Sequence, residues 1–183
     1  MSVQYYHLEE GLRRKAAAVK LIATDVDGVL TDGKIIYDAN GSEQKSFNVK
    51  DGFIVSHLQA HGIMVGAITA RRSKAGEIRC EELGFDFHCQ GAYDKVAKLA
   101  EVLEQHNIGW EEVAYIGDDL LDLPVLGKVG FSVCPADALP YIQEKANFIS
   151  SCVGGQGVFR EVGDMVLQSK GLLDKLIQQF DLK

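Results

Sequence analysis

Proline, tryptophan and cysteine are scarce in this chain of 183 residues, which has three prolines, one tryptophan and four cysteines. The cysteines, at positions 80, 89, 134 and 152, include no Cys-x-x-Cys pair, so the sequence offers neither a zinc-ribbon pattern nor a disulfide framework. The five histidines are scattered along the chain, so no zinc or iron site is expected. Reduced thiols of this kind are typical of a cytoplasmic protein.

Long apolar runs and excess positive charge are also missing. No stretch approaches the roughly 20 apolar residues of a membrane span, and the first residues lack the apolar core of a signal peptide. Lysine and arginine number 19 against 26 aspartates and glutamates, which gives a net charge of −7. An acidic chain is a poor partner for nucleic acid. We therefore expect a cytoplasmic protein without membrane or nucleic-acid partners, folded as a single domain over residues 1–183.

The most informative stretch runs from Lys20 to Gly33. A short apolar run, typical of a buried parallel strand, ends in Asp25 and Asp27, and Gly28 follows. In extended backbone the i, i+2 spacing directs both carboxylates to the same side. Because burying unpaired charge is costly, two acids at a strand end require a partner, and a metal ion with a phosphorylated substrate would supply one.

Two other interpretations of the acid pair are an EF-hand calcium loop and a purely structural turn. An EF-hand calcium loop needs further oxygen ligands and a glycine at its sixth position, where this chain has Leu30. A strand, rather than a helix, also precedes the motif. The second alternative is structural, with Asp25 and Asp27 capping a turn. Catalysis explains the position at the strand end better than either.

Apolar strand patterns alternate with helical patterns along the chain, which predicts an α/β fold with a doubly wound, mostly parallel, Rossmann-like sheet. An Asn40-Gly41 turn between two extended segments predicts a β-hairpin at about 34–49 that protrudes from the sheet. A glycine-rich tail is expected at about 154–183, and its removal is expected to leave the centre of the fold intact. No internal repeat or interdomain linker is present.

Polar residues gather at the ends of three predicted strands. Asp25 and Asp27 follow the first, Thr69 the second, and Asp118 with Asp119 a later one. In open α/β sheets, ligands bind beyond the carboxyl ends of the strands. Lys95 opens a helix, where a cation is mildly unfavourable unless its ammonium reaches an anion. We therefore expect these side chains to form one site.

The chain resembles the haloacid dehalogenase superfamily from about residue 19 to 168. Four motifs carry the resemblance: Asp25-Val-Asp27-Gly, Ile68-Thr69, Lys95, and Gly117-Asp118-Asp119-Leu-Leu-Asp122. Within the superfamily, four longer segments resemble the 3-deoxy-D-manno-octulosonate 8-phosphate phosphatases: 25–33, 47–52, 68–71 and 154–161. Ala70 departs from that pattern, which usually has glycine there, and adds one methyl group near the phosphate pocket.

The resemblance implies a Mg²⁺-dependent phosphatase that acts in lipopolysaccharide biosynthesis through an aspartyl phosphate. Asp25 would be the nucleophile and Asp27 the general acid and base. Thr69 and Lys95 would hold phosphoryl oxygens. The metal would be bound by Asp25, by the main-chain carbonyl of Asp27 and by Asp118. Two further acids would orient waters and Lys95 from behind these ligands: Asp119 and Asp122.

The sugar acid of such a substrate carries a carboxylate as well as a phosphate. Arg71, just after Thr69, and Arg160 are the candidates to bind it, because guanidinium pairs bidentately with carboxylate. Arg72 and Lys74 are possible substitutes, and the sequence leaves the choice open.

No cap domain is expected, because 43 residues separate Asp25 from Thr69 (26 through 68) and 25 separate Thr69 from Lys95 (70 through 94). A monomeric site would be open to water, which phosphoryl transfer tolerates poorly. The hairpin at 34–49 is therefore expected to pair with those of other subunits. The resemblance implies a homotetramer of this kind, in which the glycine-rich tail reaches an adjacent active site.

Three other functions remain open at this stage. The first is a phosphatase of the same mechanism acting on a nine-carbon, sialic-type acid 9-phosphate. The second is a phospho-accepting signalling receiver, although receivers carry their adjacent acid pair after the first strand, whereas Asp118-Asp119 comes late here. The third is a non-catalytic oligomerisation module, which the presence of all four motifs disfavours.

Overall fold

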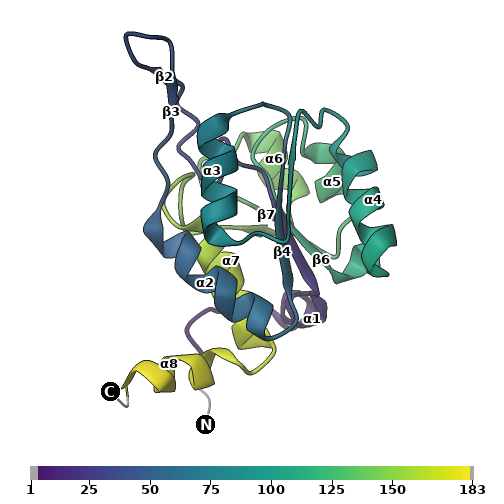
Figure 1. Cartoon of the computed structure of the whole chain (residues 1–183). Helices are drawn as coiled ribbons and strands as arrows, with labels where there is room; N and C mark the ends of the chain where they lie inside the picture. The colour runs from purple at the N-terminus through teal and green to yellow at the C-terminus, as the bar shows by residue number, and fades with distance from the viewer. Residues whose placement is uncertain (1–3, 182–183) are drawn as a thin grey trace.

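The computed structural model describes residues 4–181 and has a six-stranded sheet at its centre (Figure 1). The strands lie in the order β5-β4-β1-β6-β7-β8, and every neighbouring pair is parallel. This confirms the predicted α/β fold with a parallel sheet. The strand bounds are β1 Leu21–Thr24, β4 Met64–Thr69, β5 Phe87–Gln90, β6 Val113–Ile116, β7 Phe131–Cys134 and β8 Phe148–Ile149.

Helices pack on both faces of the sheet. One hydrophobic core contains side chains from five helices: α1 Glu10–Ala18, α2 Val49–Ala60, α3 Lys74–Leu83, α7 Val158–Ser169 and α8 Leu173–Asp181. The core on the other face contains side chains from three: α4 Lys95–His106, α5 Leu123–Leu126 and α6 Pro140–Lys145. The short 3-10 helix η1, Trp110–Glu112, precedes β6, and α8, Leu173–Asp181, follows α7.

The central strand β1 contributes to both cores. Ile22 packs with one of them, while Leu21 and Ala23 pack with the other. This alternation follows from the two-residue period of a strand. All four residues of β1 are buried, as expected for a parallel sheet covered on both faces.

The order of the strands places a switch point at β1. From β1 the chain proceeds to β4 on one side, and later to β6 on the other, and both pair with β1 directly. In sheets of this type the crevice beyond the carboxyl ends at the switch point is the usual ligand site. The active site is therefore expected at the carboxyl ends of β1, β4 and β6.

The predicted hairpin is present and projects from the rest of the fold (Figure 1). Its two strands, β2 Ile36–Tyr37 and β3 Glu43–Gln44, are antiparallel. They are much shorter than the predicted range, because residues 45–48 make no ladder bonds. Ile36 and Tyr37 leave 47% and 62% of their surface exposed, so the hairpin presents apolar side chains to solvent.

The expectation that residues 154–183 are a dispensable tail is wrong. Helix α7, which lies within that range, packs against α1 and α2 on one face of the sheet (Figure 1). Its apolar side chains include Phe159 and Val162, both fully buried in the core. Removing this helix would expose one face of the sheet and unfold the protein. Helix α8 is more exposed, but its buried residues, Leu173 and Leu176, belong to the same core.

Among the helices of residues 4–181, none has both the length and the apolar character needed to cross a membrane.

Candidate active site

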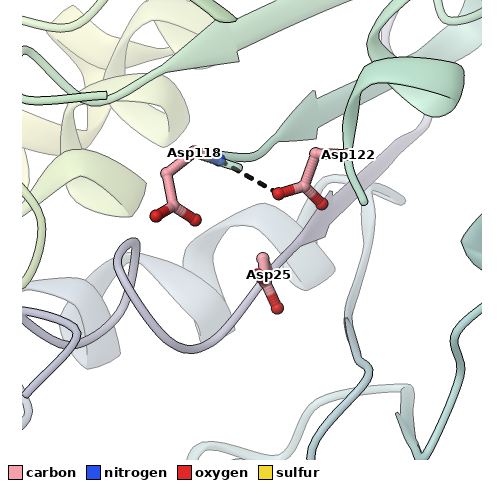
Figure 2. A group of neighbouring side chains, drawn as sticks. All are labelled: Asp25, Asp118 and Asp122. Atoms are coloured by element: carbon pink, nitrogen blue, oxygen red, sulfur yellow. Dashed lines mark hydrogen bonds between the residues drawn. The ribbon is translucent and has the colours of Figure 1, made fainter. Parts of the chain in front are cut away.

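Three carboxylates meet at the carboxyl ends of β1 and β6. Asp25 follows β1, whereas Asp118 and Asp122 come from the loop after β6 (Figure 2). Each offers an oxygen, and these three oxygens lie within 4.8 Å of one another. Two of the predicted motifs, distant in sequence, are thus brought together.

Glycines permit this close approach of the two loops. Gly28 has a positive φ of +91°, and a Cβ built on it would overlap the carboxylate of Asp118. A Cβ on Gly117 would likewise overlap the side chain of Asp122. The glycines of the Asp-x-Asp-Gly and Gly-Asp-Asp motifs are therefore required by the packing of the acids.

Lys95 lies among the acids. Its Nζ is 3.0 Å from Asp25 Oδ2 and 2.6 Å from Asp122 Oδ1, and only 1% of its side chain is exposed. Lys95 is the first residue of α4, and Asp94 caps that helix by accepting a hydrogen bond from the N–H of Ala97 at 2.9 Å. The ammonium of Lys95 thus reaches the carboxylates of Asp25 and Asp122, as the sequence predicts for a lysine at the start of this helix.

Asp122 is the anchor of the cluster. Its Oδ1 accepts hydrogen bonds from Lys95 and, at 2.6 Å, from the buried hydroxyl of Tyr115. Its Oδ2 accepts from the N–H groups of Asp118, at 3.1 Å, and Asp119, at 3.2 Å. With both oxygens engaged, Asp122 orients its neighbours. The side chain of Asp119 is exposed and accepts a hydrogen bond from the N–H of Leu120 at 2.7 Å.

The electrostatics of the cluster favour an added cation. Burial, followed by the charge of Asp122, raises the pKa of Asp25 to about 7. Burial, followed by the charge of Asp25, raises the pKa of Asp118 to about 8. Burial alone would lower the pKa of Lys95, but the carboxylates of Asp25 and Asp122 outweigh it and the pKa rises. One ammonium does not neutralise three carboxylates, so negative charge is left uncompensated.

The donor atoms fit a magnesium ion. Asp118 Oδ1 is buried and has no hydrogen-bond partner among residues 4–181. Asp25 retains lone pairs, because its Oδ1 accepts from the N–H of Val26 at 2.7 Å and its Oδ2 meets Lys95. Mg²⁺ prefers hard oxygen ligands and takes few of them from protein. Asp25 and Asp118 therefore have side-chain oxygens that suit such an ion.

Asp27 is held by a network that the sequence analysis missed. The ammonium of Lys45, whose side chain is 1% exposed, forms an ion pair with Asp27 and lies 3.6 Å from Glu43 Oε1. Glu43 also meets Arg71, whose Nη2 is 2.5 Å from the same oxygen. The network connects the base of the hairpin to residues 25–33, which follow β1 and are called here the catalytic loop because they carry the candidate catalytic acids Asp25 and Asp27. Its signal in the sequence was the spacing of Glu43 and Lys45, which directs both side chains to one face of an extended strand.

The remaining predicted residues are spread more widely. Thr69 is buried at the end of β4, and its Oγ1 accepts from the N–H of Arg71 at 3.2 Å. Arg160 lies in α7, where its Nε donates to Asp164 at 2.9 Å and its guanidinium stacks over the ring of Phe53 at 5.1 Å. No hydrogen bond or ion pair between residues 4 and 181 connects Arg160 to the acid cluster of its own chain.

A cavity of about 420 Å³ opens beside Lys95. It is lined by apolar side chains from the loop before α4 and from the region between β6 and α5, among them Tyr93, Leu120 and Leu121. Tyr93 and Leu120 are 73% and 57% exposed. The single chain thus leaves an open apolar wall next to the charged cluster.

Comparison with known proteins gives consistent matches. Residues 88–162 match the model of the haloacid dehalogenase-like hydrolase family. The 3-deoxy-D-manno-octulosonate 8-phosphate phosphatase of Escherichia coli K12 is 44% identical over 161 residues, which is 88% of this chain and 86% of the relative.

Solved structures give the same picture. The corresponding phosphatase from Yersinia pestis has a TM-score of 0.88 at 41% identity, covering 90% of this chain and 89% of the other. The enzyme of that name from Moraxella catarrhalis, solved with magnesium, phosphate and KDO, has a TM-score of 0.90 at 36% identity, covering 92% and 97%.

Proposed function

Because this chain belongs to the family of 3-deoxy-D-manno-octulosonate 8-phosphate phosphatases within the haloacid dehalogenase superfamily, we propose that it hydrolyses that sugar-acid phosphate to the free sugar acid and phosphate. The reaction belongs to lipopolysaccharide biosynthesis. The observation that carries the proposal is the convergence of Asp25, Asp118 and Lys95 at the switch point of the sheet. The relatives are named for the eight-carbon substrate, and nothing favours the nine-carbon alternative.

The first half-reaction is displacement at phosphorus. A carboxylate oxygen of Asp25 attacks the phosphorus, the bond from phosphorus to the sugar oxygen breaks, and Asp25 becomes an aspartyl phosphate. Asp27 donates a proton to the departing oxygen, which leaves as the C8 hydroxyl group. Asp27 carries this proton in the substrate complex, and the contact with Lys45 keeps its carboxyl group in position.

The second half-reaction restores the protein. Asp27, now ionised, removes a proton from a water molecule, and the resulting hydroxide attacks the phosphorus of the aspartyl phosphate. Inorganic phosphate departs and the carboxylate of Asp25 is regenerated. Lys95 and Thr69 hold the other phosphoryl oxygens while charge shifts between them.

Mg²⁺ would be held by Asp25, Asp118 and the main-chain carbonyl of Asp27. When bound, it neutralises the phosphoryl oxygens and so permits an anionic phosphate to approach an anionic nucleophile. Asp122 keeps Asp118 and Lys95 in place through its four hydrogen bonds.

The site is proposed to be completed by a neighbouring subunit of a homotetramer. Two observations support this: the apolar residues of the hairpin are exposed, and so is the apolar wall of Tyr93 and Leu120 beside Lys95. An arginine that meets the substrate carboxylate is then Arg71 from the same chain or Arg160 from a neighbour. A cytoplasmic location is part of the proposal and is supported by four cysteines that form no disulfide.

A substrate screen tests the proposal. Purified protein is assayed with eight-carbon and nine-carbon sugar-acid phosphates, with and without Mg²⁺, and released phosphate is measured. The eight-carbon substrate should have the highest kcat/KM, and chelation should abolish turnover. Preference for the nine-carbon substrate, or full activity in excess chelator, would contradict the proposal.

A further inference from the structure

A segment far from the catalytic motifs in sequence lies against the catalytic loop. This segment, residues 150–155, is called here the glycine segment and lies between β8 and α7. The N–H of Gly155 donates to the carbonyl of Val29 at 2.9 Å. A Cβ built on Gly155 would lie 2.7 Å from the N atom of Asp32, and one on Gly154 would overlap backbone oxygens of the same loop. Backbone therefore packs directly on backbone, without an intervening side chain.

Two carboxylates hold the glycine segment in place. Glu161 of α7, which is 6% exposed, accepts a hydrogen bond from the hydroxyl of Ser150. It also accepts from the N–H of Ser151 at 2.9 Å and from the Ser151 hydroxyl at 2.7 Å. Asp137 accepts from the N–H of Gly154 at 2.9 Å. The first helix turn of α7 thus fixes the segment that contacts the loop.

Gly28 lies between the glycine segment and the metal site. On one side, the carboxylate of Asp118 occupies the space that a Cβ of Gly28 would fill. On the other side, the carbonyl oxygen of Gly28 is so close to Gly154 that a Cβ there would overlap it. Gly28 follows Asp27, whose main-chain carbonyl is the proposed metal ligand. Any shift of this peptide changes the separation between two metal ligands.

We infer that the glycine segment, clamped by Glu161, is a positioning element that sets the distance between the catalytic loop and Asp118, and hence the affinity of the site for Mg²⁺. The inference rests on the proposed function for the identity of the ligands. Its physical basis is that Mg²⁺ demands near-ideal octahedral geometry and tolerates little displacement of its ligands. None of the segment's own side chains needs to touch the ion.

Two glycine variants separate this role from ordinary backbone strain. Gly155 and Gly171 have nearly equal positive φ values, +72° and +69°, so the strain that alanine causes in the left-handed conformation is similar at both. Only at Gly155 would the new methyl also meet the catalytic loop, because no atom of residues 4–181 lies within 4 Å of a Cβ at Gly171. Gly155→Ala should raise the Mg²⁺ concentration for half-maximal activity by about tenfold or more, and Gly171→Ala should leave it unchanged.

A second pair of variants tests the hydrogen bonds between Glu161 and the glycine segment. Glu161 and Gln168 lie on the same helix, and each makes three hydrogen bonds to a neighbouring segment. Those of Gln168 go to Tyr5 and Tyr6, at the far end of α7. Glu161→Ala should weaken metal binding, whereas Gln168→Ala should only lower the melting temperature. Glu161→Gln keeps the side-chain volume and tests the same point if the alanine variant does not fold.

Metal binding is measured directly, by calorimetric titration of Mn²⁺ into metal-free protein without substrate. A selective loss of Mn²⁺ affinity in the Gly155 and Glu161 variants supports the inference even if the protein fails to hydrolyse the proposed substrate. Equal Mn²⁺ affinity within each pair, with wild-type turnover intact, would overturn the inference and leave the proposed function standing.

Discussion

Lys95 and Asp122 form an ion pair in which Nζ lies 2.6 Å from Oδ1 and both side chains are almost completely buried, at 1% and 0% exposure. The same ammonium is 3.0 Å from Asp25. Lys95 is therefore held in place before any phosphate arrives, between the proposed nucleophile and the residue that anchors the loop after β6. A lysine fixed in this way stabilises developing charge without reorganising.

Lys95→Met should cost both stability and activity. The substitution leaves Asp25 and Asp122 buried without their cation, and breaking a buried pair in this way costs about 3–5 kcal/mol. Urea unfolding at neutral pH and phosphate release would measure the two effects. Lys98→Met is the matched control in the same helix, because Lys98 pairs with Glu101 at the surface, where such pairs contribute about 0–1 kcal/mol. Equal losses in the two variants would contradict the role of Lys95.

Asp25→Asn should remove turnover while the protein stays folded. An amide cannot form the acyl phosphate, so kcat should fall by several orders of magnitude. Asp27→Asn should lose the acid and base contribution, typically about 10²–10⁴-fold. Asp32→Asn is the control in the same loop, since its side chain is exposed and its ion pair is with the exposed Lys34. Acid quenching of the wild-type protein during turnover should trap a phosphoenzyme, and the same treatment of Asp25→Asn should trap none. Near-normal turnover by Asp25→Asn would exclude the mechanism.

The fold and the centre of the site were predictable because their signals are local. A buried strand that ends just before Asp25 places this acid at the carboxyl edge of the sheet, and Asp27 lies in the turn that follows. Lys95 at the start of a helix was unusual enough to indicate an anion, and Asp25 with Asp122 proved to be its partners.

The parts that were missed depend on contacts between distant segments. The spacing of Glu43 and Lys45 gives the direction of these side chains, but the burial of Lys45 against Asp27 depends on how the base of the hairpin packs on the loop after β1. The sequence predicts a tail at Gly154 and Gly155 because their partners, Gly28 and Asp32, lie more than 100 residues earlier. The place of α7 in the core likewise depends on contacts with α1 and α2, which lie far from it in the sequence.

Asp118→Ala should weaken the metal site selectively. The substitution removes a carboxylate whose Oδ1 is buried without a partner among residues 4–181. Loss of a residue that merely orients a metal ligand typically lowers metal affinity about 10–100-fold. Loss of the ligand itself should therefore raise the Mg²⁺ concentration for half-maximal activity more than tenfold. Asp119→Asn, one residue later and exposed, should have a much smaller effect. Magnesium titrations of activity after chelation distinguish the two. An unchanged magnesium requirement in Asp118→Ala would contradict its assignment as a ligand.

The metal-free protein should lose stability as pH rises from about 4 to about 8. The pKa values of Asp25 and Asp118 are raised in the folded state, to about 7 and about 8, so the folded protein binds more protons than the unfolded chain across this range. The free energy of unfolding then falls with increasing pH. Because Mg²⁺ competes with these protons, its stabilising effect should be larger at about pH 8 than at about pH 5.

Urea unfolding in chelator and in Mg²⁺, at several pH values, checks this dependence. Asp118→Asn is the informative comparison, because it removes one of the two titrating groups and should flatten the profile of the metal-free protein. A metal-free protein that becomes more stable between about pH 5 and 8 would show that the acid cluster does not govern the pH dependence.

The exposed apolar side chains of the hairpin should hold the oligomer together. A double substitution, Ile36→Glu with Tyr37→Glu, places two charges on β2, whose side chains make no core contacts in the single chain. The fold should therefore survive, but the subunits should separate. Gln44→Glu is the control, since Gln44 pairs directly with Ile36 in the hairpin and is already polar.

If a neighbouring subunit closes the site over the sugar, separation of the subunits should reduce turnover of the sugar-acid phosphate far more than turnover of a small phosphate ester. The reason is that Asp25, Lys95 and the metal contact only the phosphoryl group. Light scattering and kinetics on both substrates measure the two effects. A fully active monomer, or equal losses on both substrates, would show that each subunit carries its own specificity.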